Sequence, residues 1–203
     1  MTAYIWDLDG TLLDSYPVIT EAARRAAEQA GLSDPPEEIL GKVKLETLSA
    51  YLRDASGRSG VPFEQLLEEY RKLTHEMDGE IRAMDGAEET LERLQREGGT
   101  HFVYTHRGKS AGPILERLGL LRFFREIVTP EAGFPLKPAG DGVRYLVEKY
   151  GLDPEKTWYV GDRSLDVLCG RDAGVKTMLL LEPDSPVAPT GLEDRIIRSL
   201  WEA

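Results

Sequence analysis

Apolar residues gather in five short, nearly continuous runs along the chain, each rich in Val, Ile, Leu, Tyr or Trp. The runs are Ala3–Leu8, His101–Thr105, Glu126–Thr129, Thr157–Val160 and Lys176–Leu181. Continuous apolar runs of this length are typical of strands that are covered on both faces, as in a parallel sheet. The pattern therefore predicts five buried strands.

Between the later runs, apolar residues recur at the three- and four-residue spacing of amphipathic helices, and a glycine follows each segment. These segments are Ala87–Glu97, Ser110–Leu118, Gly142–Tyr150 and Leu165–Ala173. Strands that alternate with helices predict βαβ units and a doubly wound parallel α/β sheet. Near the end of the chain, Glu182–Thr190 carries three prolines and predicts a loop, and Gly191–Trp201 predicts a closing helix.

The interval from Asp14 to about Met84 breaks this alternation, because it contains no convincing strand. Three stripes of helical spacing fall within it, at Pro17–Ala30, Lys44–Arg53 and Phe63–Leu73, and the pair Pro35-Pro36 separates the first two. The interval predicts an all-helical insert after the first strand. The alternative is three more helices of a single layered domain.

Charge and cysteine content exclude several classes of function. The 203 residues include 25 Lys plus Arg and 36 Asp plus Glu, a formal net charge of -11. Because nucleic-acid binding needs a basic face, DNA and RNA are not expected partners. A single cysteine, Cys169, excludes an intrachain disulfide and a zinc site of paired cysteines. The chain has neither a basic leader nor an apolar run long enough for a membrane, so we expect a soluble cytoplasmic protein without a membrane partner. Its oligomeric state is not readable from the sequence.

The first predicted strand ends in two carboxylates, Asp7 and Asp9, followed by Gly10. Residues two apart in a strand point to the same face, so both side chains project together. They stand at the carboxyl end of a parallel strand, where open α/β sheets bind ligands. Close like charges need compensation, which a hard cation such as Mg²⁺ supplies. A turn that simply closes the strand explains one aspartate but not both.

A second acidic pair follows the fourth predicted strand. Asp162 stands at the strand end, and Asp166 lies four residues further on, one turn away if a helix begins there. Both side chains can then face one site. An equally good interpretation is that Asp162 is only a helix N-cap.

Two further positions can bind phosphate. Thr105 ends the second predicted strand, and its hydroxyl, with the backbone N–H groups that follow, forms a plausible phosphate cradle. An ordinary threonine N-cap is the alternative. Lys137 lies in Phe134–Pro138, a stretch held extended by prolines, and by itself reads as a solvated charge.

Taken together, these elements resemble the haloacid dehalogenase-like hydrolase superfamily. The segment Asp7–Thr11 looks like its first motif, Thr105 its second, Lys137 its third, and Gly161-Asp162 with Asp166 its fourth. Order and approximate separations agree over nearly the whole chain. The form of the segment 161–174 is similar to the phosphoglycolate phosphatase-like branch, which carries a helical cap. The resemblance implies a Rossmann-like catalytic core at 1–13 and 85–203 and a helical cap at 14–84.

The resemblance also implies a mechanism. Asp7 would be the nucleophile that forms an aspartyl-phosphate, and Asp9 the general acid and then the general base. Mg²⁺ would be held by the Asp7 carboxylate, the Asp9 backbone carbonyl and Asp162. Phosphoryl oxygens would contact Thr105, the His106 backbone N–H and Lys137.

Asp166 would orient Lys137 or a metal-bound water. Asparagine is common in the family where this chain has His106, so the departure puts a phosphoglycolate substrate in doubt. The dehalogenases lack an aspartate equivalent to Asp9, so its presence favours phosphoryl transfer. Phosphonatases of the family need a cap lysine, and two lysines in the insert leave that chemistry open.

We therefore expect a Mg²⁺-dependent phosphatase that hydrolyses a small phosphorylated metabolite. The alternatives are a sugar phosphomutase of the β-phosphoglucomutase type and, less in keeping with the insert, a phospho-accepting regulatory domain. Lys42 and Lys44 resemble the glycine-led specificity segment of helical caps. They are candidates for substrate recognition, although lysines that flank a helix are usually just solvated. The sequence does not name the substrate.

Overall fold

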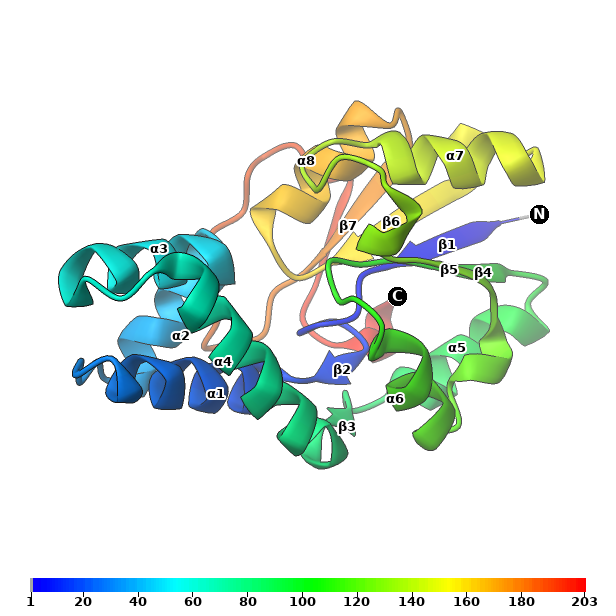
Figure 1. Ribbon diagram of the computed structural model, residues 1–203. Coiled ribbons are helices and arrows are strands. Elements are labelled where there is room, and N and C mark those ends of the chain that lie inside the picture. Colours follow the sequence, from blue (N-terminus) through cyan, green and yellow to red (C-terminus); the bar gives the residue numbers. More distant parts are fainter. Residues whose placement is uncertain (1) are drawn as a thin grey trace. The chain divides into compact units, whose positions relative to one another are not determined.

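A six-stranded parallel sheet forms the centre of the larger part of the chain (Figure 1). The computed structural model describes residues 2–203. Within them the sheet has the order β5-β4-β1-β6-β7-β8, and every neighbouring pair is parallel. The strands are β1 (Ala3–Trp6), β4 (Thr100–Tyr104), β5 (Phe124–Val128), β6 (Thr157–Gly161), β7 (Lys176–Leu180) and β8 (Arg195–Ile197). Each of the five predicted strands is present.

Helices cover both faces of this sheet, as the doubly wound prediction requires. In Figure 1, α7 (Asp141–Tyr150) and α8 (Ser164–Asp172) lie on one face, and α5 (Ala87–Arg96) and α6 (Ala111–Arg117) lie on the other. The central strands β1, β4, β6 and β7 are mostly buried, as expected for strands that are covered on both faces, whereas β5 and β8 at the sheet edges are more exposed. Core side chains such as Ile5, Phe102 and Tyr159 are at most 1% exposed.

The closing helix expected at Gly191–Trp201 is wrong, because this segment forms β8 and a short 3₁₀ turn, η5 (Leu200–Glu202). Ile196 lies opposite Leu179 in β7, and the Leu181 N–H donates to the Ile197 carbonyl at 2.9 Å. An unpaired edge of β7 offers backbone hydrogen bonds that a segment of only a few apolar residues can complete. The apolar spacing alone fitted a helix equally well.

A small antiparallel ribbon was also not predicted. It joins β2 (Leu13–Asp14) to β3 (Arg82–Ala83), two residues each, and Asp14 lies opposite Arg82. The chain divides at this ribbon into two compact units. One comprises the residues up to Asp14 together with Arg82–Ala203, and the other is Ser15–Ile81.

The unit Ser15–Ile81 is helical apart from its connections. It contains α1 (Tyr16–Gln29), α2 (Pro36–Leu45), α3 (Leu48–Ser59), α4 (Phe63–Met77) and η1 (Asp78–Glu80). Its own apolar core includes Ile39, Leu52 and Ala55, which are fully buried. The unit therefore buries a core without help from the sheet.

The single helix expected over Lys44–Arg53 is wrong, because α2 ends at Leu45 and α3 begins at Leu48. Thr47 interrupts the pattern, since its side-chain oxygen accepts the N–H of Ala50 at 3.0 Å and so starts a new helix. The proline pair lies between α1 and the next helix, as predicted. It also begins α2, because the first helical position tolerates a missing N–H. No helix described over residues 2–203 is long and apolar enough to cross a membrane.

Candidate active site

The predicted site residues of the larger unit meet where the strand order reverses, between β1 and β6. Trp6 lies opposite Val160 in the two strands, and the Asp7 N–H donates to the Val160 carbonyl at 2.9 Å. The residues that follow these strands, Asp7 and Asp162, therefore emerge side by side at the carboxyl edge. Such a reversal point opens a crevice in doubly wound sheets.

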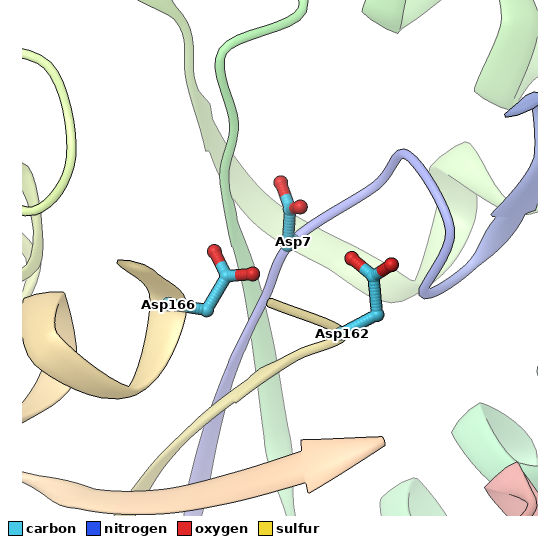
Figure 2. A group of neighbouring side chains, drawn as sticks. All are labelled: Asp7, Asp162 and Asp166. Carbon is cyan, nitrogen blue, oxygen red and sulfur yellow. The ribbon is translucent and has the colours of Figure 1, made fainter. Parts of the chain in front are cut away.

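Three buried carboxylates converge there (Figure 2). Asp7, Asp162 and Asp166 come from the end of β1, the end of β6 and the first turn of α8. Each offers an oxygen within 4.8 Å of the other two, and each is at most 2% exposed. Gly161 permits this packing, because a Cβ atom there would overlap the Asp166 carboxyl group.

Lys137 offsets part of this negative charge. Its Nζ lies 2.8 Å from Asp7 Oδ1 and 2.8 Å from Asp166 Oδ1, and its side chain is fully buried. The rings of Tyr104 and Tyr159 lie 5.7 and 5.4 Å from the same nitrogen. Burial alone would lower the pKa of Lys137, but the carboxylates of Asp166 and Asp7 outweigh it and raise the pKa. The lysine is therefore held as a cation.

The two carboxylates that contact Lys137 differ in their remaining oxygen. Asp166 Oδ2 accepts the Arg163 N–H at 3.0 Å, so both its oxygens are bonded, and the positive groups of Lys137 and Arg163 outweigh burial and lower its pKa. Burial raises the pKa of Asp7, against the effect of Lys137. Asp7 Oδ2 is buried and has no hydrogen-bond partner within the described part of the chain.

An oxygen of this kind fits a metal ion. Buried polar atoms are normally hydrogen-bonded, and a carboxylate oxygen that lacks a donor is suited to a hard cation. Asp7 and Asp162 provide carboxylate oxygens from adjacent strands, which are the ligands that Mg²⁺ prefers. The residues present therefore fit the predicted cation.

At the end of β4, Thr105 and His106 lie in a loop that is tied to Lys137. Thr105 Oγ1 accepts the Arg107 N–H at 3.0 Å, and Thr105 is 1% exposed. The His106 ring contributes more than the predicted backbone N–H, since its Nε2 accepts the Lys137 N–H at 2.8 Å. Burial, with nearby Lys137 and Arg163, lowers the pKa of His106 to about 3, so the ring is neutral and suited to accept.

Asp9 contacts an arginine that sequence reasoning missed. Arg107 donates from Nε and Nη2 to Asp9 Oδ1, at 2.9 and 2.6 Å, and from Nη1 to Ser110 Oγ at 3.2 Å. The side chain of Arg107 is 8% exposed and that of Asp9 is 19% exposed. The available signal was a basic residue two positions after Thr105, in the loop after a predicted strand.

The two lysines expected to read the substrate, Lys42 and Lys44, belong to the helical unit. Lys42 Nζ lies 3.4 Å from Asp54 Oδ2 in a partly exposed ion pair. Lys44 is 7% exposed, and its Nζ lies 4.5 Å from the centre of the Tyr16 ring. Both therefore have neighbours within their own unit.

Comparison with known proteins establishes the family. The sequence profile described as "Haloacid dehalogenase-like hydrolase" matches residues 4–180. The chain belongs to the haloacid dehalogenase-like hydrolases. The predicted family and the predicted class of enzyme, a hydrolase, are thereby confirmed.

Two curated relatives cover most of the chain. A phosphoglycolate phosphatase of Agrobacterium fabrum is 30% identical over 201 residues, 89% of this chain and 85% of the relative. An N-acetylmuramic acid 6-phosphate phosphatase of Pseudomonas aeruginosa is 32% identical over 184 residues, 87% of this chain and 80% of the relative. Both names describe phosphatases, which supports the predicted hydrolysis of phosphate esters.

A solved structure confirms the fold class. A haloacid dehalogenase-like family hydrolase from Streptococcus pneumoniae is superimposable with a TM-score of 0.83 at 21% identity. The match covers 100% of this chain and 96% of the solved chain. The sheet and its helices are thus those of a haloacid dehalogenase-like hydrolase.

Proposed function

We propose that this protein is a Mg²⁺-dependent phosphatase that hydrolyses a small phosphomonoester through an aspartyl-phosphate at Asp7. The observation that carries the proposal is the Asp7 carboxylate itself. It is buried at the carboxyl ends of β1 and β6, one oxygen lies 2.8 Å from Lys137 Nζ, and the other has no partner among the described residues. Membership of the hydrolase family and the two phosphatase relatives support the same reaction.

The chemistry assigned to the two aspartates proceeds in two steps. Asp7 attacks phosphorus, so that a carboxylate–phosphorus bond forms while the bond to the leaving oxygen breaks. Asp9 gives a proton to that leaving oxygen and then takes one from the water that hydrolyses the aspartyl-phosphate. In the second step the water oxygen bonds to phosphorus while the Asp7–phosphorus bond breaks. Alcohol and inorganic phosphate leave, Asp7 returns as a carboxylate, and Asp9 returns as a protonated carboxyl group.

We assign Mg²⁺ to the Asp7 carboxylate, the Asp9 backbone carbonyl and Asp162. When bound, the cation reduces repulsion between the anionic nucleophile and the anionic phosphoryl group. Asp166 orients Lys137, which it contacts at 2.8 Å.

Three groups are assigned to the phosphoryl oxygens: the Thr105 hydroxyl, the His106 backbone N–H and the Lys137 ammonium. Thr105 and Lys137 are both buried, and the His106 ring joins their two loops through its bond to the Lys137 N–H. A buried cation interacts strongly with an anion because water does not screen it. An acidic protein can therefore bind a phosphate at this place.

We further propose that residues 1–13 and 85–203 act as the catalytic core and residues 14–84 as a cap. A cap of this kind excludes bulk water and reads the leaving group. Lys42 and Lys44 remain our candidates for that recognition, and the buried Lys44 is the one whose charge water screens less. An anionic or polyhydroxyl leaving group suits them.

Purified protein tests the proposal with a panel of phosphorylated metabolites that includes phosphoglycolate and N-acetylmuramic acid 6-phosphate. Phosphate release should require Mg²⁺, stop with EDTA, and return when Mg²⁺ is restored. Asp7→Asn should abolish release, whereas Asp85→Asn, the same change at an exposed position of the same unit, should not.

Full activity of the Asp7→Asn variant would contradict the mechanism. Isomerisation of a sugar phosphate faster than its hydrolysis would instead identify a mutase. Modification limited to about one phosphate per chain would indicate a phospho-accepting domain.

A further inference from the structure

Arg107 is a buried charge that the mechanism above does not use. Its side chain is 8% exposed, and it lies in the loop between β4 and α6. Burying a guanidinium is costly unless it is paired and hydrogen-bonded. The partner that it meets is Asp9, the residue assigned to proton transfer.

Arg107 is anchored at several points before it reaches that carboxylate. Its backbone N–H donates to Thr105 Oγ1 at 3.0 Å, and its Nη1 donates to Ser110 Oγ at 3.2 Å. The loop and the head group are therefore both fixed by their own neighbours. A planar guanidinium held in this way presents its remaining N–H groups in one direction.

Two of those N–H groups bind a single oxygen. Nε and Nη2 donate to Asp9 Oδ1 at 2.9 and 2.6 Å. Charge-assisted bonds of this length are strong, and two donors on one atom restrict both its position and the rotation of the carboxyl group. The bond spans 98 residues of sequence, so it also ties the loop after β1 to the loop after β4.

We infer that Arg107 is a positioning residue for Asp9. It holds Oδ1, so the proton that goes to the leaving oxygen is carried by Oδ2, and the carboxyl group is fixed for that transfer. The inference rests on the proposed function, because it needs Asp9 as the proton donor. Proton transfer depends on distance, since a donor must come within hydrogen-bond distance of the oxygen that it protonates. A carboxyl group that rotates freely is beyond that distance for part of the time.

The loss of activity expected when Arg107 is replaced depends on the leaving group, so two substrates can distinguish a positioning role from a structural one. Nitrophenolate departs without a proton, whereas an alkoxide leaves only when it is protonated. Loss of positioning at Asp9 should slow an alkyl phosphate far more than an aryl phosphate. A merely structural role of Arg107 would slow both equally.

The test measures kcat/KM for ethyl phosphate and for p-nitrophenyl phosphate, because this constant reports the step that expels the leaving group. Arg107→Gln should lower kcat/KM for ethyl phosphate about tenfold or more beyond its effect on p-nitrophenyl phosphate. Arg107→Lys keeps the charge but not the paired donors, and should give a smaller selective loss. Arg96→Gln, at an exposed arginine of α5, is the matched control and should change neither constant.

Asp9→Asn supplies the reference, since it removes proton transfer directly and should show the same selectivity. Because both changes act on one proton transfer, the double variant should lose little more than Asp9→Asn alone. If Arg107→Gln does not fold, Ser110→Ala replaces it. This change removes the acceptor of Nη1 without touching Asp9, and it should give a weaker loss of the same selectivity.

Two outcomes separate failure of the inference from failure of the proposed function. Wild-type protein without phosphate release on either substrate would refute the function. Selectivity in Asp9→Asn together with an equal loss, no loss or a gain on both substrates in the arginine variants would refute the inference alone. A rise in KM confined to substrates that carry a carboxylate would also overturn it, because Arg107 would then bind substrate rather than position Asp9.

Discussion

His101 couples the stability of the sheet to pH. The residue lies in β4 and is 1% exposed. Its Nδ1 accepts the indole N–H of Trp6 at 3.1 Å, and its Nε2–H donates to the Leu91 carbonyl at 3.1 Å. A proton added at Nδ1 would break the bond to Trp6 and bury a charge. Burial lowers the pKa of His101 from 6.5 to about 4, although the bond to Leu91 opposes the shift.

The sign and size of the effect follow from that difference. In the unfolded chain the histidine takes up a proton as the pH falls below 6.5, whereas the folded protein does not until about pH 4. The stabilising contribution is therefore complete above pH 6.5 and is lost as the pH falls towards 4. Between about pH 7.5 and pH 5 this single group should remove ~2 kcal/mol from the free energy of unfolding.

Urea unfolding followed by tryptophan fluorescence measures this loss, because Trp6, Trp158 and Trp201 all belong to the unit that contains the sheet. His101→Gln is the comparison, since its amide can both accept and donate but does not titrate. The wild-type protein should lose ~2 kcal/mol more than this variant between about pH 7.5 and pH 5. All other titrating groups cancel in the difference. Parallel pH profiles for the two proteins would refute the reasoning.

Three further changes probe packing and the site. Gly142→Ala places a Cβ 2.5 Å from the buried Tyr104 ring and should destabilise the protein by about 1–3 kcal/mol in urea unfolding, whereas Gly112→Ala, with no heavy atom within 4 Å, should not destabilise it. The thiol of Cys169 should resist a chromogenic thiol reagent at about pH 8 until urea is added, because burial raises its pKa to about 12; rapid reaction of the native protein would contradict this. His106→Leu leaves a backbone N–H without its acceptor and should cost about 1–3 kcal/mol of unfolding free energy, while His106→Gln retains an acceptor and should cost less; equal losses would argue against that bond.

The parts of the fold that could be predicted are those with a strong local pattern. Buried parallel strands need apolar residues on both faces, so runs such as Thr157–Val160 stand out from the rest of the chain. β8 could not be recognised in this way, because it has only three residues, of which only Ile197 is fully buried. Its conformation depends on the open edge of β7, which is a property of the assembled sheet. The break between α2 and α3 depended on one side-chain cap at Thr47, which a spacing argument overlooks.

The site residues that could be predicted are those that directly follow a strand. Asp7 and Asp162 were found because each directly follows an apolar run, and parallel strands bring their carboxyl ends to one edge. What brings them together is register: Trp6 lies opposite both Val103 and Val160, so residues just beyond all three strands must meet.

The bond between Arg107 and Asp9 could not be predicted from the strand register. The register places the loop after β4 beside the loop after β1, but it does not determine which side chain of one loop bonds with which of the other. That choice depends on the turn closed by Thr105 Oγ1 and on Ser110, which fix the direction of the guanidinium. Strand ends therefore supply the reacting carboxylates, and loop residues fix how one of them is held. In relatives that share this sheet and Asp9, the leaving-group selectivity should vary with the residue at the Arg107 position, which tests the inference independently of mutagenesis.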